Sequence, residues 1–258
     1  MIRKDGLVET LMSQDLTSTK HDWSDRWEHI YQFIHAWTGL NFRPQPDIKR
    51  LEKLELELGI TLPPSAREWC FLGWSASKLR GYFSFRDGPL FVTSFPEHNA
   101  ISLLTQAEGD VKWVIETQDL DKDDPPVMAF FLDYEADEET FAKRGMWAPT
   151  VSAFAFDYFL AYLDSTGGGF AVSTDSFPYD RAALAADFGE PTQFGDTEYF
   201  LRDGILVFTS HNPISWHHEV VKVEFQRSIP VEQLPPSIQV LSKAAYMRSG
   251  AFIDLDKF

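Results

Sequence analysis

The chain has 258 residues, of which 44% are hydrophobic and 15% aromatic, so it carries apolar material for one large or two small globular domains and is not a disordered protein. Its net charge of −16 argues against direct binding to nucleic acid or to an anionic membrane surface, because such binding depends on lysine and arginine side chains that meet phosphates. A single cysteine, Cys70, excludes an internal disulfide framework.

Residues 1–21 show no sustained periodicity and no apolar stretch of the kind that a signal peptide contains. The longest apolar runs, such as VMAFFL at 127–132, are far shorter than the roughly 18 residues of a membrane-spanning helix. We therefore expect a cytoplasmic protein.

Three helices are predicted before residue 75, at 22–39, 47–59 and 61–74. The first two each begin with an aspartate suited to cap the helix and end with a glycine suited to the left-handed conformation. The third has proline at or near its first position, where a missing backbone N–H costs nothing.

Strands are predicted next, around Asp87-Gly88 and at 111–117 and 126–134. The helix predicted over 148–164 has Asp157 as its only charge between Val151 and Leu163. A helix that is apolar all round is buried on more than one side.

The run STGGGF at 165–170 is the best candidate for a domain boundary. Beyond it we predict a helix at 180–189, a hairpin around Asp203-Gly204, a strand at 219–226 with alternating valines, and a closing helix at 235–250. The order of elements lacks regular β-α-β alternation, which favours an α+β fold with mainly antiparallel sheet flanked by helices. The predicted parts are a lead-in and helix (1–46), a first domain (47–164) and a smaller C-terminal α+β extension or second domain (170–258).

Two short sequence motifs each occur twice in the chain. FRDGPLFVTS (85–94) and LRDGILVFTS (201–210) share six of ten residues, and LPPS occurs at 62–65 and at 234–237. Because the two echoes have different offsets, recurring hairpin chemistry explains them better than a tandem duplication, although a remote duplication stays open. Under either explanation the RDG motif is predicted to be a folding signal and not a site. In the second copy, the consecutive apolar residues Leu206, Val207 and Phe208 predict burial on both faces of the strand.

The segment 116–139 concentrates the negative charge, since it holds ten acidic residues and one lysine and so carries −9 of the −16. These acids bracket the apolar strand 126–132, and we expect both flanks to project from neighbouring ends of one element. One reading is two solvated loops, and the other is an acidic patch for a basic protein partner. The candidate contact residues are Asp119, Asp121, Asp123, Asp124, Asp133, Glu135, Asp137, Glu138 and Glu139.

No other motif predicts catalysis, a metal or a cofactor. DLDKDD (119–124) lacks the glycine and the final glutamate of a calcium loop. His217 and His218 would point to opposite faces if they lie on a strand, so we do not expect them to share one metal. Cys70 lies between Trp69 and Phe71 and is expected to be a buried structural thiol. We predict that the chain is not an enzyme.

Residues 48–74, IKRLEKLELELGITLPPSAREWCFLGW, resemble the opening signature of the SUKH superfamily, which is known from a yeast cell-wall-synthesis regulator and many bacterial toxin-immunity proteins. The matching positions are Leu51-Glu52, Leu58-Gly59, Leu62-Pro63 and Trp69. Ser152, Phe159-Leu160 and Leu163 resemble the closing helix signature of the family, so the resemblance covers about 47–164.

The resemblance implies a protein-binding module without enzymatic activity, most simply an immunity-type protein that neutralises a toxin by binding it. An acidic inhibitor suits a basic toxin, of which a nuclease is one example. Two alternatives stay open: a regulatory or scaffold adaptor in cell-wall or signalling pathways, and an enzyme or small-ligand binder that uses an inter-domain pocket.

Overall fold

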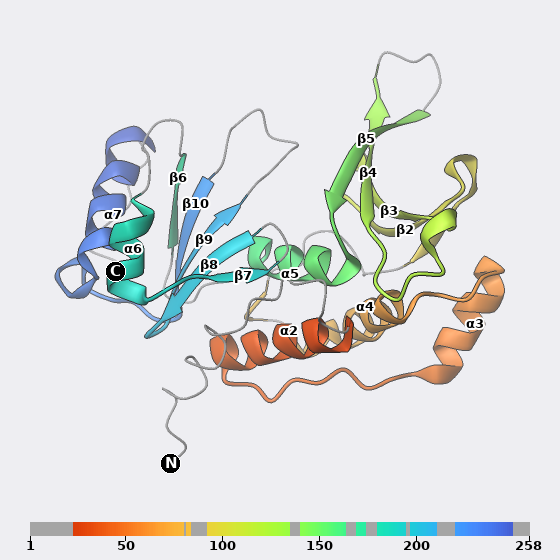
Figure 1. Ribbon diagram of the computed structural model, residues 1–258, viewed down its shortest axis with the longest axis horizontal. Helices are drawn as coiled ribbons and strands as arrows, with labels where there is room; N and C mark the ends of the chain where they lie inside the picture. Colours follow the sequence, from red (N-terminus) through yellow and green to blue (C-terminus); the bar gives the residue numbers. More distant parts are fainter. Residues whose placement is uncertain are drawn as a thin grey trace. The chain divides into compact units, whose positions relative to one another are not determined.

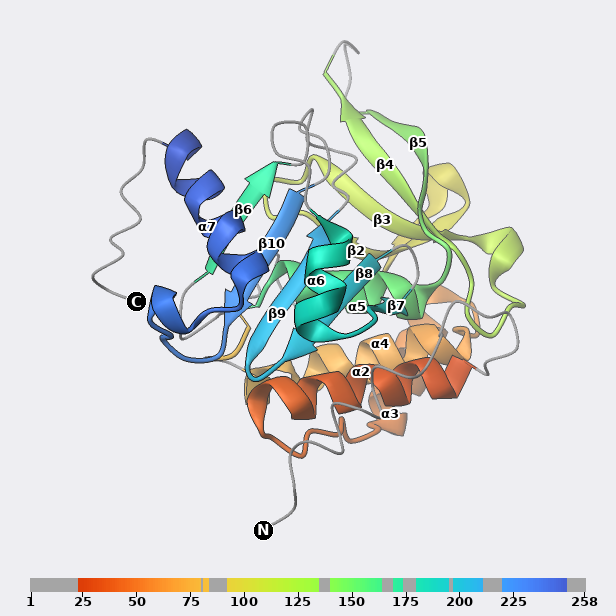
Figure 2. The same ribbon diagram turned by 60° about the vertical axis from the view of Figure 1, so that its left-hand side comes forward.

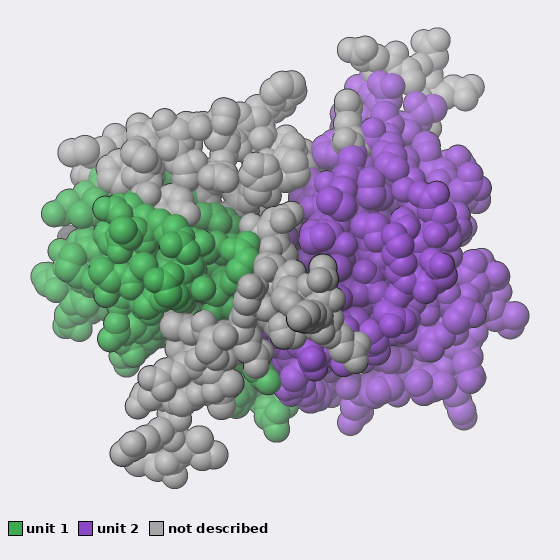
Figure 3. Space-filling view, viewed as in Figure 1, with its two compact units in different colours: residues 1–18, 32–41, 163–258 green, residues 19–31, 42–162 purple. Residues whose placement is uncertain are grey.

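The structure is a computed structural model that describes residues 23–79, 81–83, 92–134, 140–163, 169–173, 180–194, 197–210 and 220–249. Its described residues form two compact units (Figure 3). Unit 2 contains 23–31 and 42–162, and unit 1 contains 32–41 and the chain from Leu163 onward. Helix α2 (Trp23–Thr38) contributes its first half to unit 2 and its second half to unit 1.

Unit 2 combines helices with a five-stranded antiparallel sheet of order β1-β2-β3-β4-β5 (Figure 1). Besides the first half of α2, its elements in chain order are α3 (Ile48–Leu58), α4 (Pro64–Ser75), η1 (Ala76–Leu79), β1 (Thr93–Phe95), η2 (Pro96–His98), β2 (Ala100–Thr105), β3 (Val111–Glu116), η3 (Thr117–Asp119), β4 (Val127–Asp133), β5 (Thr140–Ala148) and α5 (Val151–Ala161).

The predicted helix boundaries follow from local chemistry. The Asp47 side chain accepts a hydrogen bond from the Arg50 backbone N–H at 3.1 Å, and Gly59 ends α3 at φ +69°. Pro64 is the first residue of α4. These features confirm the second and third predicted helices.

The sheet of unit 2 curls strongly. In a flat sheet the first and fifth strands are about 19 Å apart, at 4.8 Å per strand. Phe95 in β1 nevertheless has its ring centroid 5.5 Å from that of Phe130 in β4 and 5.6 Å from that of Phe141 in β5. The ammonium of Lys112 lies over the Phe95 and Phe141 rings, at 4.3 and 4.4 Å from their centroids. The concave face of the sheet therefore closes around its own aromatic cluster.

Helix α5 is buried almost along its whole length, as its lack of charge predicts. Phe154 packs on Trp69 of α4 and on Trp113 of β3, with ring centroids 5.3 and 6.0 Å apart. Phe156, on another side of the helix, packs against His29 of α2 at 6.0 Å. Unit 2 is thus organised around α5.

Unit 1 contains a second five-stranded antiparallel sheet, of order β6-β10-β9-β8-β7. Besides the second half of α2, its elements in chain order are β6 (Gly169–Ser173), α6 (Arg181–Phe188), β7 (Thr192–Phe194), β8 (Thr197–Arg202), β9 (Ile205–Ser210), β10 (Val220–Phe225), η4 (Val231–Gln233) and α7 (Pro236–Ser249).

Helices α6 and α7 cover one face of this sheet (Figure 2), where Val221, Val223 and Phe225 of β10 join one apolar core with residues of both helices. Phe33 of α2 meets Tyr199 on the other face, with ring centroids 5.8 Å apart. Leu206, Val207 and Phe208 are all buried. The prediction of a strand buried on both faces is confirmed.

The second RDG motif forms the predicted hairpin turn between β8 and β9. Asp203 and Gly204 both have positive φ, +51° and +80°, as a two-residue turn of this type requires. The first copy, Arg86-Asp87-Gly88, lies outside the described residues. Each LPPS motif leads into a helix, α4 or α7. The leucine of each motif, Leu62 or Leu234, is buried just before the helix begins.

The fold is α+β with antiparallel sheets and flanking helices, as predicted. Strands β2, β5, β6 and β7 are not in the prediction. No helix in the described part of the chain is long and apolar enough to cross a membrane.

Candidate functional site

The predicted acidic contact residues fall into two groups that β4 separates. Residues 119–124 precede this strand and Asp133 ends it. A strand of seven residues spans about 20 Å at 3.3 Å per residue. The expectation that both flanks project from neighbouring ends is therefore wrong for Asp133, which lies at the far end of β4. The remaining candidates, Glu135, Asp137, Glu138 and Glu139, lie outside the described residues.

Asp124 holds the loop between β3 and β4 against two helices. One of its carboxylate oxygens accepts hydrogen bonds from the Arg26 guanidinium of α2 at 2.9 Å and from the Ser152 hydroxyl of α5 at 2.5 Å. The other accepts the Ser152 backbone N–H at 3.0 Å, which satisfies a donor at the start of α5. The Asp124 side chain is only 3% exposed.

This geometry corrects the assignment of Asp124 as a contact residue. A carboxylate that is buried and neutralised by Arg26 presents almost no charge to a partner. Sequence alone gave no sign of this role, because Arg26 and Ser152 are 98 and 28 residues away along the chain. Asp124 is a positioning residue for the loop.

Further hydrogen bonds fix the backbone of the loop. The Asp123 carbonyl accepts the Ser65 N–H at the start of α4, at 3.0 Å. The Thr117 N–H and hydroxyl both donate to the Asn99 carbonyl, at 2.8 and 2.6 Å. The loop is therefore anchored at its beginning and at its end, so that little conformational freedom remains to be lost on binding.

The exposed charge of the loop resides in Asp121 and Asp123. Asp119 forms an ion pair of 2.6 Å with Lys122, and its side chain is largely buried. Asp121 and Asp123 are exposed, and no ion pair joins either of them to another residue in the described part of the chain. We call residues 119–124 the acidic loop, with Asp121 and Asp123 as its two available carboxylates.

The acidic loop presents negative charge that can attract and orient a cationic surface. Among the described residues, no three His, Cys, Asp or Glu side chains converge as metal ligands. The histidines at 211, 217 and 218 lie outside the described residues. The chemistry that this arrangement supports is electrostatic recognition.

Cys70 is buried, as expected, and burial raises the pKa of its thiol to about 12. We predict that Ellman's reagent modifies the native chain at pH 8 at least about a hundredfold more slowly than the urea-denatured chain, because only the thiolate reacts. Absorbance at 412 nm checks this, and the chain has a single cysteine, so the signal needs no assignment. Equal rates in the two states would contradict the burial of Cys70.

Comparison of the chain with protein-family models gave no match, and neither did comparison with curated proteins or with solved structures.

Proposed function

We propose that the chain is a non-enzymatic protein-binding module that recognises a basic protein partner through the acidic loop, in the manner of an immunity protein that neutralises a toxin. The observation that carries this proposal is a rigidly anchored loop with two exposed carboxylates, Asp121 and Asp123, that no lysine or arginine of the described residues neutralises. The resemblance of residues 47–164 to the SUKH superfamily supports the same class of function.

Physical chemistry favours a basic partner over other ligands. A chain of net charge −16 repels anionic ligands at long range and accelerates encounter with a cationic protein surface. Preorganisation adds to this effect, because the Asp124 network has already fixed the loop before the partner arrives. A basic nuclease toxin, whose cleft for phosphates such a loop would cover, is the partner class that fits best.

The test begins with capture of proteins from a lysate of the source cell on the immobilised chain, with washes at low and moderate salt. A toxin-neutralising module retains one basic protein in equimolar amount, and co-expression of the chain restores growth of cells that produce this protein. Many partners in small amounts would support the adaptor alternative instead. Reproducible turnover of a substrate by the purified chain would overturn the proposal.

We predict that the double substitution D121N/D123N slows association with the captured partner about threefold to tenfold at low ionic strength and weakens the dependence of the association rate on salt. The reason is that both carboxylates attract a basic partner at long range before contact is made. Stopped-flow or surface-plasmon measurements of the association rate constant at several salt concentrations check this.

The matched control is E52Q/E108Q, which removes the same two charges from exposed positions elsewhere in unit 2. This control should change association less than twofold. Equal slowing by both double variants would show that net charge matters and the acidic loop does not, and would remove the loop from the proposal.

A further inference from the structure

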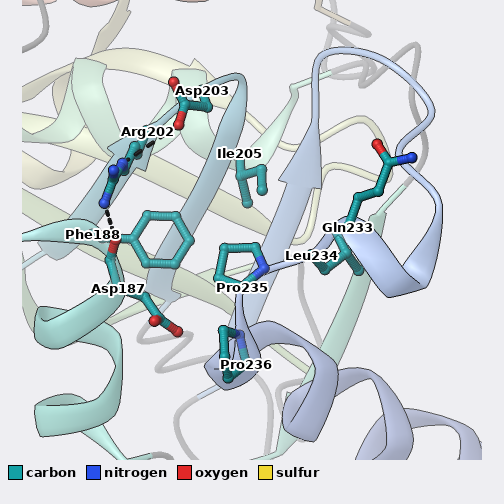
Figure 4. Close-up of a pocket in the computed structure, with 9 residues that line it drawn as sticks. All are labelled: Asp187, Phe188, Arg202, Asp203, Ile205, Gln233, Leu234, Pro235 and Pro236. Atoms are coloured by element: carbon teal, nitrogen blue, oxygen red, sulfur yellow. Dashed lines mark hydrogen bonds and ion pairs between the residues drawn. The ribbon is translucent and has the colours of Figure 1, made fainter.

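A hollow of about 280 Å³ lies within unit 1, between Arg202 and Asp203 of the second hairpin turn and residues 233–236, which lead into α7 (Figure 4). Its apolar wall comes from Phe188 at the end of α6, Ile205 of β9, and Leu234 and Pro235 before α7. Asp187, Arg202, Asp203 and Gln233 supply its polar edge. The second RDG motif thus contributes to a concave site as well as to a turn.

The walls of this hollow are fixed by hydrogen bonds between its own elements. The Arg202 guanidinium donates to the Asp187 carbonyl, which ties β8 to α6. The Asp187 carboxylate accepts the Ser237 N–H at 2.9 Å, which ties α6 to α7. The Gly204 carbonyl accepts the Gln226 N–H at 2.9 Å and holds the turn. The hollow is formed before any ligand arrives.

The charges at the edge select a cation. Asp187 and Asp203 outnumber Arg202, so that the edge carries a net charge of −1. The Asp203 side chain is 82% exposed, and its ion pair with the Arg202 Nε is 3.4 Å long and uses one carboxylate oxygen. Among the described residues, no donor is recorded for the other oxygen. An anion would meet two carboxylates here.

The size and shape of the hollow further restrict the class of ligand that fits it. The volume lies below the roughly 300–1,000 Å³ of typical small-molecule sites, which leaves room for one long side chain. An arginine side chain has an apolar stem for Phe188, Leu234 and Pro235. Its planar guanidinium carries five N–H donors and can pair with the exposed Asp203 carboxylate. Arginine is also enriched among the residues that dominate binding at protein interfaces.

We infer that this hollow, which we call the α6–α7 pocket, is a docking site for an arginine side chain of a protein partner. The inference goes beyond the acidic loop and does not depend on it, because every residue of the pocket belongs to unit 1 and every residue of the loop to unit 2.

Titration of the ¹⁵N-labelled full chain with N-acetyl-arginine-N′-methylamide tests the inference. The expected result is saturable shifts of the amide signals of Asp203, Gly204 and Gln233 with a millimolar Kd. The uncharged norleucine analogue, which has a similar apolar stem, should bind at least fivefold more weakly. Equal binding of both compounds, or shifts that do not saturate, would overturn the inference.

A variant and a second ligand sharpen the test. D203N should raise the Kd for the arginine analogue at least threefold, because asparagine tolerates the left-handed backbone and removes only the charge. E190Q, a change at another exposed acid of unit 1, should leave it unchanged. Free L-arginine that binds more than tenfold more tightly than the capped analogue would identify an amino-acid site and overturn the assignment to a protein side chain.

Discussion

The substitution Asp124→Ala is expected to lower the free energy of unfolding of unit 2 by about 3–5 kcal/mol. It removes the carboxylate that accepts hydrogen bonds from Arg26 and from the Ser152 N–H and hydroxyl. The Arg26 side chain is only 16% exposed, so its charge would remain poorly solvated without a partner. The loss of a buried ion-pair partner is among the most destabilising single changes in proteins.

Urea denaturation followed by tryptophan fluorescence measures this effect, because most tryptophans report on unit 2. Six of the eight belong to it: Trp23, Trp27, Trp69, Trp74, Trp113 and Trp147. The adjacent exposed carboxylate gives a matched control, and D123N should change the free energy of unfolding by less than about 0.5 kcal/mol.

A double-mutant cycle separates the ion pair from the loss of packing. The double variant Arg26→Met with Asp124→Ala should be less destabilised than the sum of the two single variants, because the second change leaves no unpaired charge. Strict additivity, or a cost of D124A below about 1 kcal/mol, would show that the pair does not anchor the acidic loop.

This prediction also separates the two roles that the sequence could not separate. Four aspartates of the acidic loop look alike in DLDKDD, and only the structure divides them into buried and exposed residues. If Asp124 anchors the loop while Asp121 and Asp123 meet the partner, D124A should reduce stability first and D121N/D123N should reduce association alone. Charge and burial, rather than residue type, decide the function of each carboxylate.

The sequence predicts correctly those helix ends and turns that depend on neighbouring residues. Asp47 and Gly59 mark both ends of α3, Asp180 caps α6 through the Ala183 N–H at 3.0 Å, and Asp203-Gly204 makes a turn. Each of these signals lies within four residues of its partner. Such interactions are readable in a sequence because the chain separation is short.

Strands β2 and β5 were not predicted, because their pairing is irregular. The register between β2 and β3 shifts between Ser102 and Leu104, and β4 and β5 shift twice along their length. In β5, Lys143, Arg144 and Gly145 also interrupt the apolar pattern. A bulge breaks the alternation of period two on which strand prediction depends.

The LPPS motif occurs beside both proposed binding sites, the acidic loop and the α6–α7 pocket. Each copy begins a helix, and the serine N–H of each donates to an oxygen of an aspartate: Ser65 to the Asp123 carbonyl at 3.0 Å, and Ser237 to the Asp187 carboxylate at 2.9 Å. Asp123 belongs to the acidic loop and Asp187 to the α6–α7 pocket. Each proposed binding site is therefore hydrogen-bonded to the start of a helix that follows an LPPS motif, α4 or α7. The sequence does not predict this relation, because the bonded residues are far apart along the chain.

The second large effect expected is a loss of stability on acidification that traces to His29. This residue is almost completely buried in α2 beside Phe156, and burial lowers the pKa of its imidazole from 6.5 to about 3. Between these values the unfolded chain binds a proton that the folded chain does not bind, so the free energy of unfolding falls as the pH falls. The loss amounts to about 2–3 kcal/mol between pH 6.5 and 4.5, at 1.36 kcal/mol per pH unit.

Comparison with His29→Gln isolates this contribution from that of the many carboxylates. Urea denaturation of both proteins between pH 8 and 4.5, followed by tryptophan fluorescence, should give a constant difference in the free energy of unfolding above pH 7. Below pH 6.5 the wild-type chain should lose stability more steeply than the variant, by up to one bound proton in the slope. Parallel curves over the whole range would mean that His29 takes up its proton equally in the folded and unfolded states, and would contradict the burial of its ring beside Phe156. The test therefore also shows whether solvent is excluded from the core around α5. Asp124 of the acidic loop accepts the Ser152 N–H of this helix, so the same core supports the loop.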